Sequence, residues 1–133
     1  MTLKNLEKIG QLKSEPFDQG EFDGLVRSGK ARLKDANNAS LAHESRFDLA
    51  YNAAHSFALS ALRKHGFRSV NRYVVFQALP HTLQLPQEYV RILDTCHNRR
   101  NVAEYEGYLE VDDSLLKELL KVAQVMLDKV GKS

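Results

Sequence analysis

The chain has 133 residues, of which 43% are hydrophobic and 27% charged, and its formal net charge of +2 at pH 7 is too small to indicate a nucleic-acid or membrane-surface binder by itself. This length and composition are typical of one globular domain with a single core. The lone Cys96 excludes an intrachain disulfide, and no apolar run is long enough for a signal peptide or a bilayer span, so we expect a cytoplasmic protein with no membrane partner.

The first half of the chain is predicted to form three helices. A short helix capped by Thr2 ends before Pro16, so residues 1–18 are predicted to be an N-terminal helix and linker, and residues 19–131 the core bundle. A second helix covers about residues 21–36. Ser40 then stands where it could cap a third helix over residues 41–65, which Gly66 ends.

The third helix is apolar nearly all round from Phe47 to Leu62, which predicts the central helix of a bundle. The residues of this and the later helices that we expect to be buried are Phe47, Ala50, Ala54, Phe57, Leu93, Cys96, Leu119 and Met126. The same helix also carries a polar stripe spaced by four, three and four residues, with one further amide beside it: Glu44, Asp48, Tyr51 and His55, flanked by Asn52.

The second half of the chain continues the helical pattern. Residues 67–71 are expected to form a loop, and residues 73–79 one or two helical turns, because Val74-Val75-Phe76 finds no partner strand in the sequence. A further helix begins near Gln87 and ends or bends at Gly107, and the last helix runs over about residues 113–130. We therefore predict an all-α fold, a single-domain up-and-down bundle of five to six helices.

The helix that begins near Gln87 carries the densest polar chemistry. Arg100 falls on its apolar stripe, where an unpaired cation costs several kcal/mol. Glu104, one turn on, is the nearest expected partner. His97 and Asn101 lie with Glu104 along the adjacent edge of the helix.

Two interpretations of these polar stripes remain open. In the structural one, Asp48 and Glu104 neutralise Arg100, while Asn52, Asn101 and the tyrosines satisfy the remaining polar groups. In the other, the guanidinium fork of Arg100 binds a phosphate in two places at once. No His/Cys pair has zinc spacing, and no glycine-rich loop or nucleophile elbow is present, so we expect neither a metal nor a cofactor.

Three segments resemble a known superfamily. They are Glu44-Ser-Arg-Phe-Asp48-Leu-Ala-Tyr51-Asn52-Ala, Phe76-Gln77-Ala-Leu-Pro80 and Arg100-Asn101-Val-Ala-Glu104-Tyr105. Together they are similar to the HEPN domains, and more narrowly to an actinobacterial-type group of uncharacterised members, over about residues 25–128. The resemblance implies a helical bundle that acts as a homodimer on RNA or nucleotide phosphates, in a toxin–antitoxin or stress-response setting.

The resemblance also implies roles for individual residues. Active HEPN members are metal-independent endoribonucleases in which an arginine holds the scissile phosphate and a histidine moves protons. Arg100 and Asn101 take the places of the arginine and the polar residue after it, but Tyr105 stands where the histidine is expected. About one tyrosine in a thousand is ionised at pH 7, a penalty of roughly 4 kcal/mol for a general base. His97, one turn before Asn101, is the alternative base, and its other interpretation is a surface or network histidine.

A second function from another class is a non-catalytic interaction module. Such a protein would pair with a nucleotidyltransferase, an antitoxin or another regulator, and its polar stripes would be structural. A DNA-binding transcription factor finds little support, because no helix of the sequence shows a solvent-facing basic stripe.

Overall fold

A computed structural model describes residues 2–69, 71–107 and 111–131. Over these residues the chain forms seven helices and one two-stranded sheet. In chain order the elements are α1 (Leu3–Lys8), β1 (Leu12–Ser14), α2 (Gln19–Ala36), α3 (His43–Lys64), β2 (Phe67–Ser69), α4 (Arg72–Gln77), α5 (Leu79–Thr82), α6 (Gln87–Glu106) and α7 (Asp113–Val130). The predicted helical bundle is confirmed, with α5 as a short additional helix.

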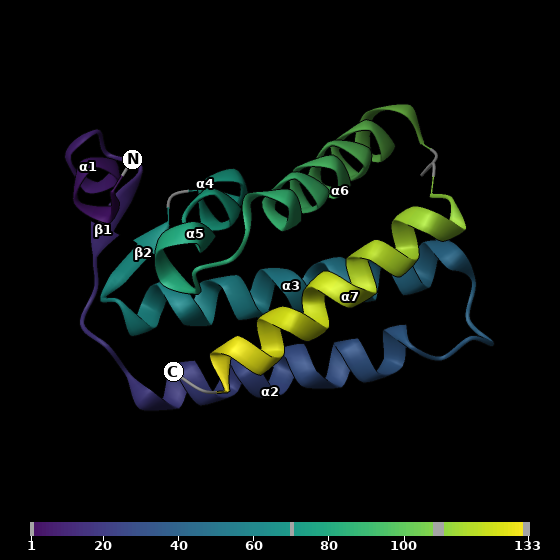
Figure 1. Ribbon diagram of the computed structural model, residues 1–133, viewed down its shortest axis with the longest axis horizontal. Coiled ribbons are helices and arrows are strands. Elements are labelled where there is room, and N and C mark those ends of the chain that lie inside the picture. The colour runs from purple at the N-terminus through teal and green to yellow at the C-terminus, as the bar shows by residue number, and fades with distance from the viewer. Residues whose placement is uncertain (1, 70, 108–110, 132–133) are drawn as a thin grey trace.

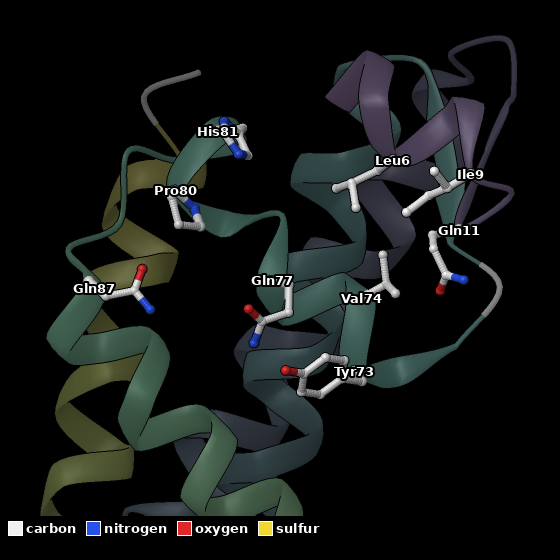
Figure 2. A pocket seen from close by; sticks show the side chains of 9 residues that line it. All are labelled: Leu6, Ile9, Gln11, Tyr73, Val74, Gln77, Pro80, His81 and Gln87. Atoms are coloured by element: carbon white, nitrogen blue, oxygen red, sulfur yellow. The ribbon is translucent and has the colours of Figure 1, made fainter. Parts of the chain in front are cut away.

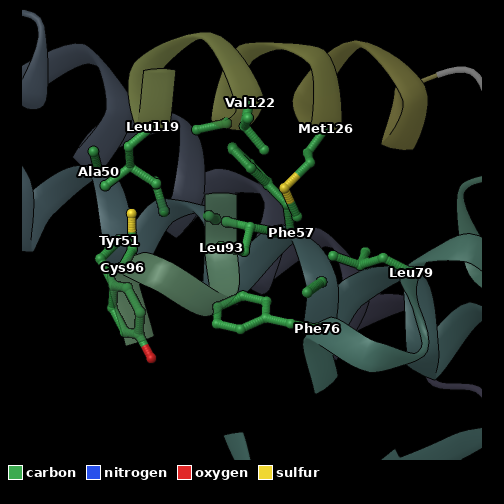
Figure 3. Close-up of a cluster of buried hydrophobic side chains, with 14 of the residues drawn as sticks. Ala50, Tyr51, Phe57, Phe76, Leu79, Leu93, Cys96, Leu119, Val122 and Met126 are labelled. Atoms are coloured by element: carbon green, nitrogen blue, oxygen red, sulfur yellow. The ribbon is translucent and has the colours of Figure 1, made fainter. Parts of the chain in front are cut away.

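The four long helices, α2, α3, α6 and α7, run alternately in opposite directions (Figure 1). Helix α3 is the central one, because it packs against α2, α7, α4, α5 and β2. All eight residues predicted to be buried have 0% exposure, and most of them meet in the core shown in Figure 3. The up-and-down arrangement with the third helix at its centre is therefore confirmed.

Helices α2 and α3 approach each other closely at Gly29. A Cβ atom on Gly29 would lie 2.4 Å from Cε1 of Phe57, so the aromatic ring occupies the space that any side chain would need. The absence of a side chain at this position thus lets the Phe57 ring pack directly against the α2 backbone.

The prediction of a loop over residues 67–71 is wrong for residues 67–69, which form the strand β2. Residues 67–69 pair with β1 in antiparallel register, with Leu12 opposite Ser69 and Ser14 opposite Phe67. Leu12 is buried in a second apolar cluster, whose other buried members are Leu6, Leu62, Val74 and Ala78. This cluster packs α1 against α4. The strand pairing was not predicted because a strand of three residues is too short to give a recognisable sequence pattern.

The helix ends follow the predicted capping chemistry with one exception. As predicted, Thr2 accepts a hydrogen bond from the backbone of Asn5 and begins α1, and Gly107 ends α6 with a φ of 79°. Asp112, which the sequence analysis did not name, accepts from the backbone of Leu115 and begins α7. Ser40 does not cap α3: its backbone and hydroxyl donate to Asn38 Oδ1 in the preceding turn, and α3 begins after Ala42. In the part of the chain that the structure describes, no helix is long and apolar enough to cross a membrane.

Candidate functional site

The polar stripes of α3 and α6 meet around Tyr51. This side chain is fully buried, and its ring stacks on Phe47 and meets the edge of Phe76 at centroid distances of 6.4 and 5.7 Å. Its hydroxyl lies 3.0 Å from Nδ1 of His97 on α6. A fully buried phenol needs such a partner, so this hydrogen bond helps to set the position of α6 along α3.

His97 is held at both ring nitrogens. Nδ1 contacts the Tyr51 hydroxyl, and Nε2 lies 3.2 Å from the amide nitrogen of Asn101, one turn further along α6. The ring of Tyr73, on α4, packs against the imidazole at a centroid distance of 6.2 Å. His97 is therefore a member of a side-chain network that joins α3, α4 and α6.

Two arginines cover the outer side of this network. The guanidinium carbons of Arg100 and Arg72 lie 4.9 and 5.9 Å from the centre of the Tyr51 ring, which places both as cation–π partners of one phenol. Nε of Arg100 is 3.8 Å from Oδ1 of Asp48, and the two side chains are 28% and 56% exposed. We give the name Tyr51 cluster to the group formed by Asp48, Tyr51, His55, Arg72, His97, Arg100 and Asn101.

The electrostatics of the Tyr51 cluster are those of a positively charged site. Burial, followed by the charges of Arg72, Arg100 and His97, lowers the pKa of His55 to about 4, so this imidazole is neutral at pH 7. Burial raises the pKa of Tyr51, although Arg72 and Arg100 partly oppose that rise. The raised pKa of Tyr51 and the lowered pKa of His55 keep both side chains neutral, next to the two permanent positive charges of Arg72 and Arg100.

The other predicted site residues lie around the cluster rather than inside it. Among the ion pairs of the described residues, Arg100 pairs with Asp48 and not with Glu104, which corrects the expectation that Glu104 is its nearest partner. Glu104 and Glu44 are exposed, and Asn52 is half-buried. The Tyr105 side chain is 88% exposed, and five residues along a helix place it about 140° around α6 from Arg100.

Arg72 is the member of the cluster that the sequence analysis did not find. It is the first residue of α4, a six-residue helix that follows the β2 strand. The direction of so short a helix depends on packing that no periodicity reveals. The sequence therefore offers no signal that would select Arg72.

The two arginines of the cluster are groups suited to an anion. Guanidinium groups only donate hydrogen bonds, and their planar fork matches two oxygens of a phosphate or carboxylate. Within the residues that the structure describes, no three His, Cys, Asp or Glu side chains come together as metal ligands.

Known protein-family models and curated proteins were both compared with the chain, and none matches it.

Proposed function

We propose that this protein recognises phosphate groups of RNA or of nucleotides at the Tyr51 cluster. The observation that supports this most is the convergence of Arg72 and Arg100, from two different helices, over the ring of one buried tyrosine. Two positive charges there face the single negative charge of Asp48, so one positive charge of these three groups remains uncompensated. An anion restores the balance at low cost.

The ion pair with Asp48 uses one nitrogen of the Arg100 guanidinium. The ion pair joins Asp48 to Nε, and no ion pair among the described residues occupies the two outer nitrogens of the fork, as expected of an arginine with one acidic anchor. Because the Asp48 carboxylate is more than half exposed, water screens its attraction for Arg100. A phosphate that contacts Arg72 and Arg100 together gains charge-assisted hydrogen bonds that this carboxylate does not fully provide.

The HEPN resemblance agrees with this role for Arg100, and we extend the proposal to a toxin–antitoxin or stress-response setting on that basis. Cleavage of RNA is a separate step, which needs a group that moves a proton. The direction of Tyr105 around α6 leaves His97 as the better placed group, but both of its ring nitrogens already have partners. We therefore propose recognition as the main activity, with any weak ribonuclease activity dependent on His97.

The proposal is tested by fluorescence anisotropy with a labelled single-stranded RNA of about ten nucleotides at low salt, the condition that favours phosphate contacts. We expect Arg72→Ala and Arg100→Ala each to weaken binding at least about tenfold, the effect of losing one charge-assisted contact, and inorganic phosphate to compete. Arg91→Ala is the matched control, because Arg91 is an exposed arginine of α6 outside the cluster.

Equal losses in all three variants, or no binding of RNA, nucleotide or phosphate by the wild type, would refute the proposal. Gel analysis of RNA incubated with chelator, for wild type and His97→Ala, reports cleavage in the same preparations.

A specific observation also favours the alternative, an interaction module. Val102 and Tyr105 lie about one turn apart on α6 and are 44% and 88% exposed, so together they form a small apolar patch on the helix surface. We propose this pair as a contact between two copies of the chain, or with a nucleotidyltransferase or antitoxin partner. Light scattering at micromolar concentration tests the homodimer: a dimer mass for the wild type and a monomer mass for Val102→Asp would support it, and a monomeric wild type would refute it.

A further inference from the structure

A cavity of about 640 Å³ is lined by the nine side chains shown in Figure 2. One of them, Tyr73, packs against His97 of the Tyr51 cluster. One side of the cavity is formed by α1 and the segment after it, another by α4, and the end by α5 and the start of α6. Its lining residues are Leu6, Ile9, Gln11, Tyr73, Val74, Gln77, Pro80, His81 and Gln87. This volume is within the range of pockets that hold small organic ligands.

The lining of the cavity selects for an uncharged ligand. No lysine, arginine, aspartate or glutamate is among the described residues that line it. Apolar surface comes from α1, α4 and Pro80, and the polar groups are three glutamine amides, a phenol hydroxyl and an imidazole. Apolar surface, the ring of Tyr73 and neutral donors and acceptors together suit a planar ring that carries hydrogen-bonding groups on its edge.

Two of the amides are already oriented by neighbours outside the cavity. The amide nitrogen of Gln77 donates to both carboxylate oxygens of Asp94, at 2.9 and 3.1 Å, so its carbonyl oxygen remains an acceptor for a ligand. The carbonyl oxygen of Gln11 accepts from Asn71 at 3.4 Å, so its amide nitrogen remains a donor. The Gln77 carbonyl oxygen thus offers an oriented acceptor on α4, of the kind that an N–H group on a nucleobase edge requires.

Tyr73 joins the cavity to the cluster. Its ring lines the cavity and also packs against His97, at a centroid distance of 6.2 Å. The preceding residue, Arg72, is one of the two arginines over Tyr51. The Tyr73 end of the cavity therefore adjoins His97, a member of the cluster.

We infer that the cavity receives the base of a nucleoside phosphate, whose phosphate binds Arg72 and Arg100. This inference rests on the proposed phosphate recognition and adds a substrate class: a nucleoside 5′-phosphate unit, either free or as one residue of an RNA. Tyr73 stands between the two parts, where its exposed ring offers a face for the base or the ribose.

Calorimetric titration with three kinds of probe tests the inference: the four nucleoside 5′-monophosphates, ribose 5-phosphate, and a tetraribonucleotide. Ribose 5-phosphate reports the phosphate site alone, because it lacks a base. We expect at least one monophosphate to bind about tenfold more tightly than ribose 5-phosphate, as the stacking of one base would provide. The tetraribonucleotide separates the two sources of the unit, since it exceeds the mononucleotide in affinity only if RNA is the ligand.

A pocket-filling variant completes the experiment. Ile9 is 55% exposed at the rim of the cavity, so Ile9→Trp should fold and partly fill the space. Phe17→Trp is the matched control, because Phe17 is 41% exposed and lies outside the cavity lining and the Tyr51 cluster. Ile9→Trp should lower the affinity for the preferred monophosphate to that for ribose 5-phosphate, with the latter unchanged. If no monophosphate exceeds ribose 5-phosphate, the base site is refuted while phosphate recognition stands. If neither the monophosphates nor ribose 5-phosphate bind, phosphate recognition itself is refuted.

Discussion

Replacement of Arg100 by alanine separates the structural interpretation of the Tyr51 cluster from the phosphate-binding one. The Arg100 and Asp48 side chains are 28% and 56% exposed, with Nε and Oδ1 3.8 Å apart, so their ion pair should contribute about 0–1 kcal/mol. The contact with the Tyr51 ring adds about 0.5–1 kcal/mol. We therefore expect the free energy of unfolding to fall by about 0.5–2 kcal/mol, and not by the roughly 3–5 kcal/mol that breaking a buried ion pair costs.

The assay combines a melting curve with the RNA titration. For a domain of this length, a loss of about 0.5–2 kcal/mol corresponds to a decrease in Tm of about 2–7 °C. Affinity for RNA should fall at least about tenfold in Arg100→Ala and less in Arg100→Lys, which keeps the charge but loses the fork. A stability loss above about 3 kcal/mol with RNA affinity unchanged would show that Arg100 is a structural residue and would contradict our reasoning.

Three further predictions concern the core. Gly29→Ala should destabilise the protein by about 1–3 kcal/mol in urea, because its Cβ would overlap Phe57, whereas Gly24→Ala, in the same helix and with no atom nearer than 3.9 Å, should stabilise it slightly. The pKa of His55 is about 4 in the fold and near 6.5 when unfolded, so the contribution of the neutral imidazole to the free energy of unfolding is complete above pH 6.5. It is lost as the pH falls toward 4, by up to about 3 kcal/mol. His55→Gln should therefore flatten the dependence of the urea-derived stability on pH between about pH 7 and 4.5, and an unchanged slope would contradict this. Burial raises the pKa of Cys96 to about 12, so iodoacetamide should label it near neutral pH only in denaturant, and rapid labelling of the native protein would argue against its burial.

The long helices could be predicted from the sequence because their signals are local and repeated. The alanine-rich stretch of α3 is apolar on nearly every side, and this places it at the centre before any contact is known. The β1–β2 pair could not be predicted in this way. Its strands have three residues each, they lie far apart in the sequence, and their pairing depends on the burial of Leu12 against α1 and α4.

The candidate site, like the fold, could be predicted from the sequence only in part. The polar stripe of α3 and the polar edge of α6 follow helical spacing, so Asp48, Tyr51, His97 and Arg100 could be selected from the sequence, and the structure brings them together. Arg72 could not be selected, because its direction depends on how α4 packs against α3 and α6. Of the two acidic partners expected for Arg100, Asp48 on the neighbouring helix forms the ion pair, and among the described residues Glu104 on the same helix forms none with it.

The position of Arg100 on an apolar stripe follows from the length of its side chain. The stripe turns toward α3, which carries the buried ring of Tyr51. The guanidinium carbon of Arg100 lies 4.9 Å from the centre of that ring. The aliphatic stem covers apolar surface while the charged end stays partly in water, so the charge is not buried with it. A core-facing position and a ligand-facing charge are therefore compatible in one arginine. This explains why an apolar stripe, which ordinarily argues for a structural role, here places a cation at the surface beside Arg72.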